Sequence, residues 1–215
     1  MKNLVSAEIE AYAEAHSMAE SVICRALREE TYRRMESPQM IVGPLEGAFL
    51  KMMTQLVGAR RVLEIGMFTG YSALCFAEVL PEDGMVITCE VDEESAGLAR
   101  TYFSRSPVGK KIEIRMGQAL DTMRDLTGQF DVIFVDADKK NYLNYFRRAT
   151  DLLAPNGVIL IDNVLWNGDV LQLPPPDEQT AAIQELNRVV SADPSVSAVL
   201  VTIRDGILVV KKTMR

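Results

Sequence analysis

The sequence predicts an α/β fold built on a mostly parallel sheet that ends in an antiparallel hairpin. From "RRVLEIG" onward, short β-rich runs alternate with helical patterns, which is typical of right-handed βαβ crossovers with helices on both faces. The chain then ends in "SVSAVLVTI" and "GILVVKK", joined through Arg204, Asp205 and Gly206. This connection is too short for a helical crossover, so the last strand is expected to run antiparallel to its neighbour.

The elements follow in order along the chain. Residues 3–35 show helical periodicity in two segments, the second of which ends before Ser37-Pro38. Ser17 and Glu20 have the spacing of a capping box that opens a helix after His16. Strands are expected near 60–66, 85–90, 111–115, 130–136 and 157–162, and helices near 71–80, 92–105, 118–126, 140–153 and 177–192.

Length and composition indicate a single domain over residues 1–215. Apolar residues make up 48% of the chain and charged residues 25%, which is ordinary globular composition. No apolar run approaches the roughly 18 residues of a membrane span, and the acidic, amphipathic start is unlike a secretory signal. Cys24, Cys75 and Cys89 are scattered through apolar patterns, which favours reduced thiols over disulfides or a metal cluster. We therefore expect a cytoplasmic protein with no membrane partner.

The first two predicted strands end in features of a nucleoside site. In "EIGMFTGYS", Gly66 and Gly70 precede a helix and allow a tight turn with close ligand approach, but the spacing is not the G-x-G-x-x-G of a pyrophosphate cradle. Glu90 ends the second strand, where a carboxylate can accept hydrogen bonds from ribose hydroxyls. Glu64 lies inside the apolar "RVLEIG" and needs a partner, either a cationic ligand end or backbone amides.

Polar side chains also follow the fourth and fifth predicted strands. "FVDADKKNY" places Asp136, Asp138 and Lys139 after one strand, and "VILIDNVLW" places Asp162 and Asn163 after the other. Solvation of loop ends would explain any one of these acids. Because the strands are expected to be neighbours, Asp136, Asp162 and Asn163 should converge, and oxygen ligands without histidine or thiolate suit a hard cation such as Mg²⁺.

Four segments resemble the cation-dependent, S-adenosylmethionine-dependent O-methyltransferases, which include catechol O-methyltransferase and the caffeoyl-coenzyme A O-methyltransferases. These segments are "LEIGMFTGYSAL", "FVDADKKNYLNY", "GVILIDNVLWNGDV" and "RDGILVVKK", within a similarity that covers roughly residues 38–213. The resemblance implies a Rossmann-like class I methyltransferase sheet of seven strands with the last antiparallel. It also implies a catalytic fold over 38–215 and a homodimer. From their position ahead of the sheet, the N-terminal helices within 1–37 are expected to cap the substrate site.

The resemblance assigns a role to each candidate residue. The residues that it implies bind S-adenosylmethionine are Val42, Glu64, Gly66, Ser72, Glu90, Ala119 and Asp136. It assigns a divalent cation, Mg²⁺ or another such as Mn²⁺ or Ca²⁺, to Asp136, Asp162 and Asn163. Lys139 becomes the catalytic base, and Trp166 and Asp138 contact the substrate. The chain departs from the family at Ala48, where a glutamine is usual, at Arg204, where a glycine is usual, and at "PPP" (174–176).

The activity implied is methyl transfer to a hydroxyl of a catechol-like phenolic small molecule. Because His16 is the only histidine, the base must be Lys, Asp, Glu or Tyr. A cation that holds both catechol oxygens would lower the pKa of the attacking hydroxyl. Trp166 would pack against the aromatic ring of the substrate. The alternative is that it is an ordinary hydrophobic anchor.

Two alternatives stay open from the sequence. One is O-methylation of a hydroxylated wobble uridine in tRNA, which the net charge of −7 disfavours. Two basic clusters favour it, formed by Arg25, Arg28, Arg33, Arg34, Arg147 and Arg148. The other is a non-catalytic or NAD-dependent nucleotide-binding domain, which the βα alternation alone would equally suit.

Overall fold

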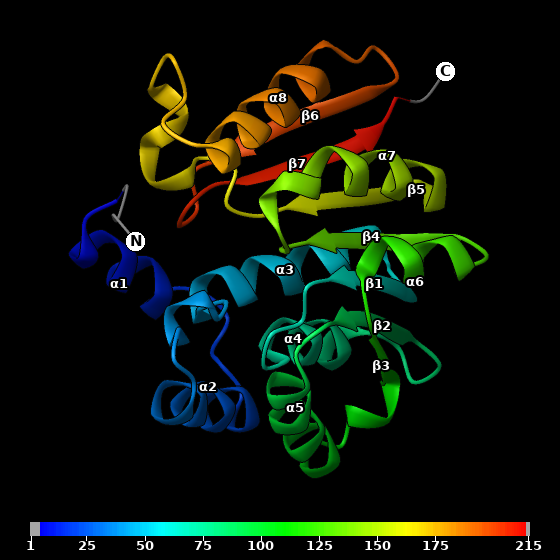
Figure 1. Cartoon of the computed structure of the whole chain (residues 1–215). Coiled ribbons are helices and arrows are strands. Elements are labelled where there is room, and N and C mark those ends of the chain that lie inside the picture. Colours follow the sequence, from blue (N-terminus) through cyan, green and yellow to red (C-terminus); the bar gives the residue numbers. More distant parts are fainter. Residues whose placement is uncertain (1–4, 214–215) are drawn as a thin grey trace.

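The computed structural model describes residues 5–213, and its centre is a seven-stranded sheet in the order β3-β2-β1-β4-β5-β7-β6 (Figure 1). The strands are β1 (Arg61–Ile65), β2 (Met85–Glu90), β3 (Ile112–Met116), β4 (Phe130–Val135), β5 (Leu153–Ile161), β6 (Val196–Val201) and β7 (Ile207–Lys212). Strands β1 to β5 pair in parallel. Strand β7 runs antiparallel to both β5 and β6, which confirms the predicted hairpin.

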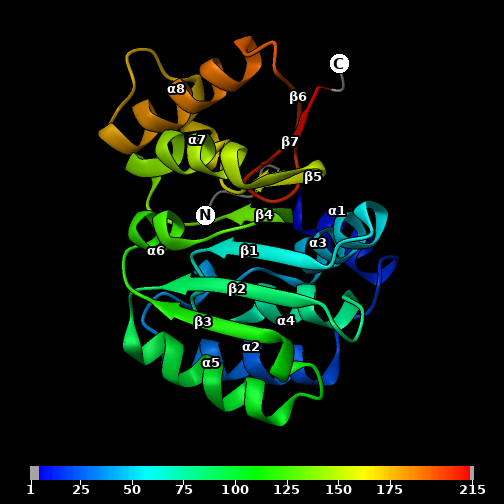
Figure 2. The ribbon, with the colours of Figure 1, turned by 90° about the vertical axis from the view of Figure 1, so that its right-hand side faces the viewer.

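Helices cover both faces of the sheet, as Figure 2 shows. One face packs against α2 (Val22–Arg34), α3 (Pro44–Val57), α4 (Tyr71–Val79) and α5 (Glu93–Arg105). The other packs against α6 (Ala119–Asp125), α7 (Tyr142–Leu152) and α8 (Glu178–Ala192). Helix α1 (Ala7–Ala15) lies against α3. Four short 3₁₀ helices complete the described elements: η1 (Pro38–Met40), η2 (Gly109–Lys111), η3 (Lys139–Asn141) and η4 (Trp166–Leu171).

The central strands explain why two helical layers are needed. In β4, Val132 and Phe134 are buried against one layer, whereas Ile133 and Val135 are buried against the other. Alternate side chains of a strand point to opposite faces, so a continuous apolar run stabilises a sheet only where both faces are covered. The polar residues that follow such a strand emerge at the edge of the sheet rather than in its core.

One detail of the predicted N-terminal region is wrong. Helix α2 begins at Val22, and its N-cap is Ser21, which accepts a hydrogen bond from the Cys24 amide at 3.2 Å. The hydroxyl of Ser17 instead donates to the Ala13 carbonyl at the end of α1, so the Ser17 capping box does not form. The helical expectation for residues 3 and 4 lies outside the described residues.

Helix α3 was absent from the sequence-based assignment. It begins with Pro44 in the first turn after Gly43 and ends at Gly58, whose φ of 66° is the left-handed conformation common after a helix. Strand β5 also begins at Leu153 rather than near 157. None of the helices formed by residues 5–213 has the length and apolar character that a membrane crossing requires.

Candidate active site

A cavity of about 1070 Å³ opens at the carboxyl ends of the parallel strands, the usual ligand position in an open α/β sheet. Its wall comes from the loops after β1 to β5, from the segment before α3 and from the turn between β6 and β7. Every predicted site residue lines this cavity except Glu64. From the N-terminal region the first lining residue is Met35, so neither α1 nor α2 contributes to the described wall.

The loop after β1 requires both of its glycines. A Cβ on Gly66 would lie 2.0 Å from the carbonyl oxygen of Asp136, and a Cβ on Gly70 would lie 2.5 Å from the ring of Phe103. Their φ angles of 92° and 89° are also unfavourable for other residues. The loop therefore brings bare backbone to the cavity between β1 and β4.

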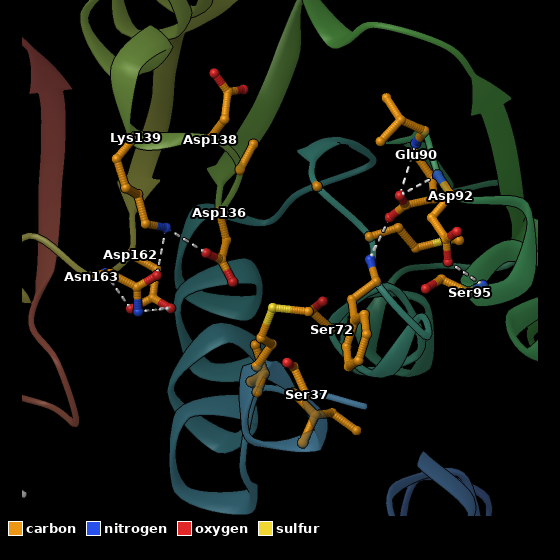
Figure 3. Close-up of a pocket in the computed structure, with 18 of the residues that line it drawn as sticks. Ser37, Ser72, Glu90, Asp92, Ser95, Asp136, Asp138, Lys139, Asp162 and Asn163 are labelled. Carbon is orange, nitrogen blue, oxygen red and sulfur yellow. Dashed lines mark hydrogen bonds and ion pairs between the residues drawn. The ribbon is translucent and has the colours of Figure 1, made fainter. Parts of the chain in front are cut away.

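The carboxylate of Glu90 joins the loops that follow β1 and β2. Its Oε2 accepts a hydrogen bond from the amide of Phe68 at 2.7 Å, and its Oε1 accepts from the amides of Val91 and Asp92, each at 2.8 Å (Figure 3). Asp92 caps α5 by accepting from the Ser95 amide at 2.7 Å. Glu90, the residue predicted to bind the ribose, is thus held in place at the cavity wall by three backbone amides. Its carboxylate oxygens can still accept further hydrogen bonds.

Glu64 lies behind the cavity rather than in it. Its side chain is 0% exposed, and its Oε2 accepts from the Thr88 hydroxyl at 2.5 Å. Burial raises the pKa of Glu64 to about 8, against hydrogen bonds from Ser72 and Thr88 that lower it. Its Oε1 has no hydrogen-bond partner among residues 5–213. Among the described residues the Thr88 hydroxyl is therefore a partner of this carboxylate, for which the sequence suggested a cationic ligand end or backbone amides.

The polar residues that follow β4 and β5 meet in one network, shown in Figure 3. The amides of Asp136 and Asp162 extend the parallel ladder, donating to Ile65 and Val135 carbonyls, each at 2.9 Å. The side-chain amide of Asn163 lies 3.0 Å from Oδ2 of Asp162. Adjacent strand ends thus bring two carboxylates and one amide oxygen to the same side of the cavity.

This donor set fits a divalent cation. Burial, followed by the nearby carboxylates of Glu46 and Asp136, raises the pKa of Asp162 well above its ordinary value. Such crowding of buried acids is relieved by a cation, and oxygen-only ligands suit Mg²⁺ or a similar hard ion. Residues 5–213 contain no group of three or more His, Cys, Asp or Glu side chains arranged for a metal, and the predicted set instead combines two aspartates with an asparagine.

Lys139 is buried within the same network. Its Nζ lies 3.1 Å from Oδ1 of Asp136, 2.6 Å from Oδ1 of Asn163 and 2.5 Å from the hydroxyl of Tyr142. The ring of Trp166 lies 5.6 Å from the same nitrogen. The amine therefore contacts the predicted cation ligands on one side and an aromatic wall on the other.

Asp138 lines the cavity but stands apart from this network. In Figure 3 its carboxylate points away from Asp136. It accepts hydrogen bonds from the Tyr145 hydroxyl at 2.5 Å and from the Asn141 side chain at 2.6 Å. Its predicted substrate contact would therefore be made at the outer rim of the cavity.

Sequence reasoning missed a buried ion pair beside the cation ligands. Nη1 of Arg204 donates to Oε2 of Glu46 at 2.8 Å and to the Ile41 carbonyl at 3.1 Å. Arg204 has a φ of 47°, a conformation that favours glycine. Next to it, Asp205 accepts from the Asn167 amide at 2.6 Å. The unusual "RDG" was the available signal for Arg204, whereas Glu46 lies on the helix that the sequence pattern did not reveal.

The sheet order, the antiparallel β7 and the site at the strand ends define the class I methyltransferase fold. The chain belongs to the O-methyltransferase family, whose model matches residues 14–213. It is 37% identical over 201 residues to catechol O-methyltransferase domain-containing protein 1 of Mus musculus, with 91% of this chain and 76% of that protein covered. It is 39% identical over 181 residues to caffeoyl-CoA O-methyltransferase 1 of Arabidopsis thaliana, with 78% and 69% covered.

Solved structures agree with this assignment. The O-methyltransferase TomG of Streptomyces achromogenes, in complex with SAM, superposes with a TM-score of 0.89 at 28% identity and covers 96% of each chain. The O-methyltransferase of Bacillus cereus, in complex with SAH, gives a TM-score of 0.88 at 30% identity, with 96% and 97% covered. The protein is an S-adenosylmethionine-dependent O-methyltransferase, which excludes the NAD-dependent alternative.

Proposed function

We propose that this enzyme transfers a methyl group from S-adenosylmethionine to a hydroxyl of a catechol-like phenolic small molecule, with a divalent cation such as Mg²⁺. The observation that carries the proposal is the single network of Asp136, Asp162, Asn163 and Lys139 at the cavity wall. A vicinal diol suits such a site because it offers two oxygens to one cation. The names of the curated relatives support catechol and caffeoyl-type acceptors.

The part of the cavity formed by the loops after β1, β2 and β3, called here the cofactor half, offers a contact for each part of S-adenosylmethionine. Gly66 offers backbone without a side chain, and Ser72 offers a hydroxyl at the start of α4. Glu90 would accept from the ribose. Ala119 begins α6, where the first amides lack helical partners and can meet an adenine edge. Val42 supplies an apolar wall from the segment before α3.

The residues of this chain then orient the acceptor and take up its proton. Asp136, Asp162 and Asn163 would hold the cation, which when bound supplies Lewis-acid chemistry that favours the ionised hydroxyl. Nζ of Lys139 would accept the hydroxyl proton. As the acceptor oxygen bonds to the methyl carbon, the carbon–sulfur bond breaks and its electron pair stays on sulfur. Trp166 would exclude water and fix the ring, so that the two reactants meet in one orientation.

Product analysis across a set of acceptors tests the substrate class. The enzyme would be incubated with S-adenosylmethionine, Mg²⁺ and either catechol, caffeate, caffeoyl-coenzyme A or phenol, and products would be read by mass spectrometry. We expect methylated catechols and at least 100-fold less product from phenol, roughly the contribution of positioning that a second oxygen provides. Equal turnover of phenol and catechol would contradict a chelating acceptor.

The basic clusters give little support to the tRNA alternative. Arg25 and Arg28 lie 3.5 and 2.8 Å from the carboxylate of Glu20, and Arg33 lies 2.5 Å from that of Glu30. Arg148 donates to a backbone carbonyl at 2.8 Å. Charges already paired with carboxylates contribute less to binding of a phosphate backbone.

Three further expectations belong to this proposal. Residues 1–215 would act as one methyltransferase domain, in which the segment 1–37 caps the substrate site and reaches the cavity wall with Met35, Glu36 and Ser37. The enzyme would be cytoplasmic, in keeping with three free, buried cysteines. It would form a homodimer, for which exposed apolar side chains such as Val22, Leu171 and Leu173 offer surface. Light scattering of the purified protein would measure its mass in solution.

A further inference from the structure

We propose that α2 and the linker before it belong functionally to the cofactor site, with Thr31 and Glu20 as positioning residues for S-adenosylmethionine. The cofactor loop is defined here as residues 66–72, between β1 and the first turn of α4. The inference rests on the assignment of this loop to the cofactor in the proposed function. It gives the N-terminal helices a role other than capping the acceptor.

The cofactor loop depends on side chains outside it to hold its shape. Gly66, Phe68 and Gly70 all have positive φ angles, of 92°, 51° and 89°. For Phe68 this conformation is strained, and such strain persists only where surrounding contacts fix it. On one side the fixing contact is the hydrogen bond from the Phe68 amide to Glu90. On the other side the contacts come from α2 and its linker.

The first of these contacts joins two buried hydroxyls. The Oγ1 atoms of Thr31 on α2 and Thr69 in the cofactor loop are hydrogen-bonded at 2.9 Å, and both residues are 0% exposed. Oγ1 of Thr31 also lies 2.9 Å from the Leu27 carbonyl one helical turn earlier. A buried hydroxyl that loses its partner is destabilising, so this pair fixes the distance between the helix and the loop.

The second contact joins the linker to the start of α4. The hydroxyl of Tyr71, a residue that also lines the cavity, donates to Oε1 of Glu20 at 2.9 Å. Burial raises the pKa of Tyr71, so the hydroxyl keeps its proton and remains a donor. Arg28 holds the Glu20 carboxylate with Nε at 2.8 Å and Nη2 at 3.0 Å. A charge-assisted, two-point contact of this kind fixes the position of the acceptor oxygens.

Helix α2 also leads directly to the cavity wall. It ends at Arg34, and the next residues, Met35, Glu36 and Ser37, line the same cavity. The same helix therefore contacts the cofactor loop and continues into a segment that lines the cavity. Because linkage is reciprocal, cofactor binding is expected to stabilise this N-terminal segment as well.

The affinity for S-adenosylhomocysteine, measured by calorimetry without acceptor or metal, tests the inference. Thr31→Val keeps the shape of the side chain and removes the hydroxyl, so we expect binding weaker by about 5- to 20-fold. Thr31→Ser keeps the hydroxyl and should stay within about 2-fold of wild type. The matched control is Thr54→Val, because Thr54 is a buried threonine on α3 whose hydroxyl bonds the Leu50 carbonyl at 2.7 Å. It should lose thermal stability but keep its affinity.

A second pair of variants keeps the inference testable if Thr31→Val does not fold. Tyr71→Phe and Glu20→Gln should each weaken S-adenosylhomocysteine binding several-fold, and the double variant should lose no more than the larger single effect. The control is Glu30→Gln on the same helix, since Glu30 pairs with the exposed Arg33.

Each outcome has a distinct meaning. Wild-type affinity in both Thr31→Val and Tyr71→Phe, with both folded, overturns the inference. Equal weakening in Thr54→Val or Glu30→Gln also overturns it, because the effect would then be one of general stability. Failure of the wild-type protein itself to bind S-adenosylhomocysteine would instead contradict the assignment of the cavity to the cofactor.

Discussion

The side-chain nitrogen of Lys139 lies 2.6 Å from Oδ1 of Asn163. The proposed base and a proposed cation ligand therefore belong to one hydrogen-bonded network, which also includes Asp136 at 3.1 Å from the same nitrogen. In this arrangement the groups that would hold the acceptor and the group that would deprotonate it cannot move independently. Their separate contributions can be measured by single substitutions.

Substitution of Lys139 should affect the chemical step more than cofactor binding. We expect Lys139→Ala to lower kcat by about 10²- to 10⁴-fold, the usual contribution of a general base. Lys139→Arg should be almost as inactive, because a guanidinium stays protonated. Calorimetry with S-adenosylhomocysteine should give affinities within a few-fold of wild type. Retained kcat in Lys139→Ala would remove Lys139 as the base.

Removal of either cation-site carboxylate should abolish metal-dependent turnover. Asp136→Ala and Asp162→Ala each delete a hard oxygen ligand, so Mn²⁺ binding, followed by electron paramagnetic resonance, should weaken together with activity. Asp121→Asn is the control, since Asp121 forms an exposed ion pair with Arg124 at 2.6 Å. Unaltered Mn²⁺ binding in both alanine variants would place the cation elsewhere.

The pair formed by Arg204 and Glu46 should show strong energetic coupling. Arg204→Gly is compatible with the φ of 47° but leaves the fully buried Glu46 uncompensated. Removing one partner of a buried ion pair lowers the free energy of unfolding by about 3–5 kcal/mol. Neutralising the remaining partner restores part of that stability. Thermal unfolding should therefore show Arg204→Gly/Glu46→Gln to be more stable than Arg204→Gly alone. A double variant that is simply additive would argue against coupling.

Glu64 should make stability fall as pH rises. Its pKa is raised from the usual 4.5 to about 8, so between these values the folded state keeps a proton that the unfolded state has lost. Unfolding then releases a proton, and the free energy of unfolding decreases with pH across this window. Glu64→Gln removes the titration. Its melting temperature relative to wild type should rise from pH 5 to 8 and level off above; a difference independent of pH would contradict the raised pKa.

Local sequence patterns predicted the strands of the sheet and their directions. The alternation from Arg61 onward gave the parallel strands, and the short connection through Asp205 gave the antiparallel hairpin, because turn length limits strand direction. The polar residues that follow β4 and β5, such as Asp136 and Asp162, could be identified for the same reason. Strand direction places them at one edge of the sheet, whatever the details of packing.

Contacts between distant segments could not be predicted in this way. Arg204 and Glu46 are 158 residues apart in sequence, and only packing of the β6–β7 turn against α3 brings them together. The hydroxyl pair of Thr31 and Thr69 is another such contact.

The misplaced cap at Ser17 has a different cause, since Ser21 offers an equivalent local signal and the fold selects between them. Helix α3 did carry local signals, Pro44 and Gly58, that mark its ends.

Methyl transfer from S-adenosylmethionine to catechol, measured by mass spectrometry with Mg²⁺ and with EDTA, tests the central claim most directly. Binding of S-adenosylhomocysteine in the same buffers would verify that the cofactor half is intact. The account predicts methylated catechol with Mg²⁺, no product with EDTA and recovery when Mg²⁺ is restored. Undiminished methylation in EDTA, by a sample verified to be free of divalent metal, would contradict a cation site formed by Asp136, Asp162 and Asn163.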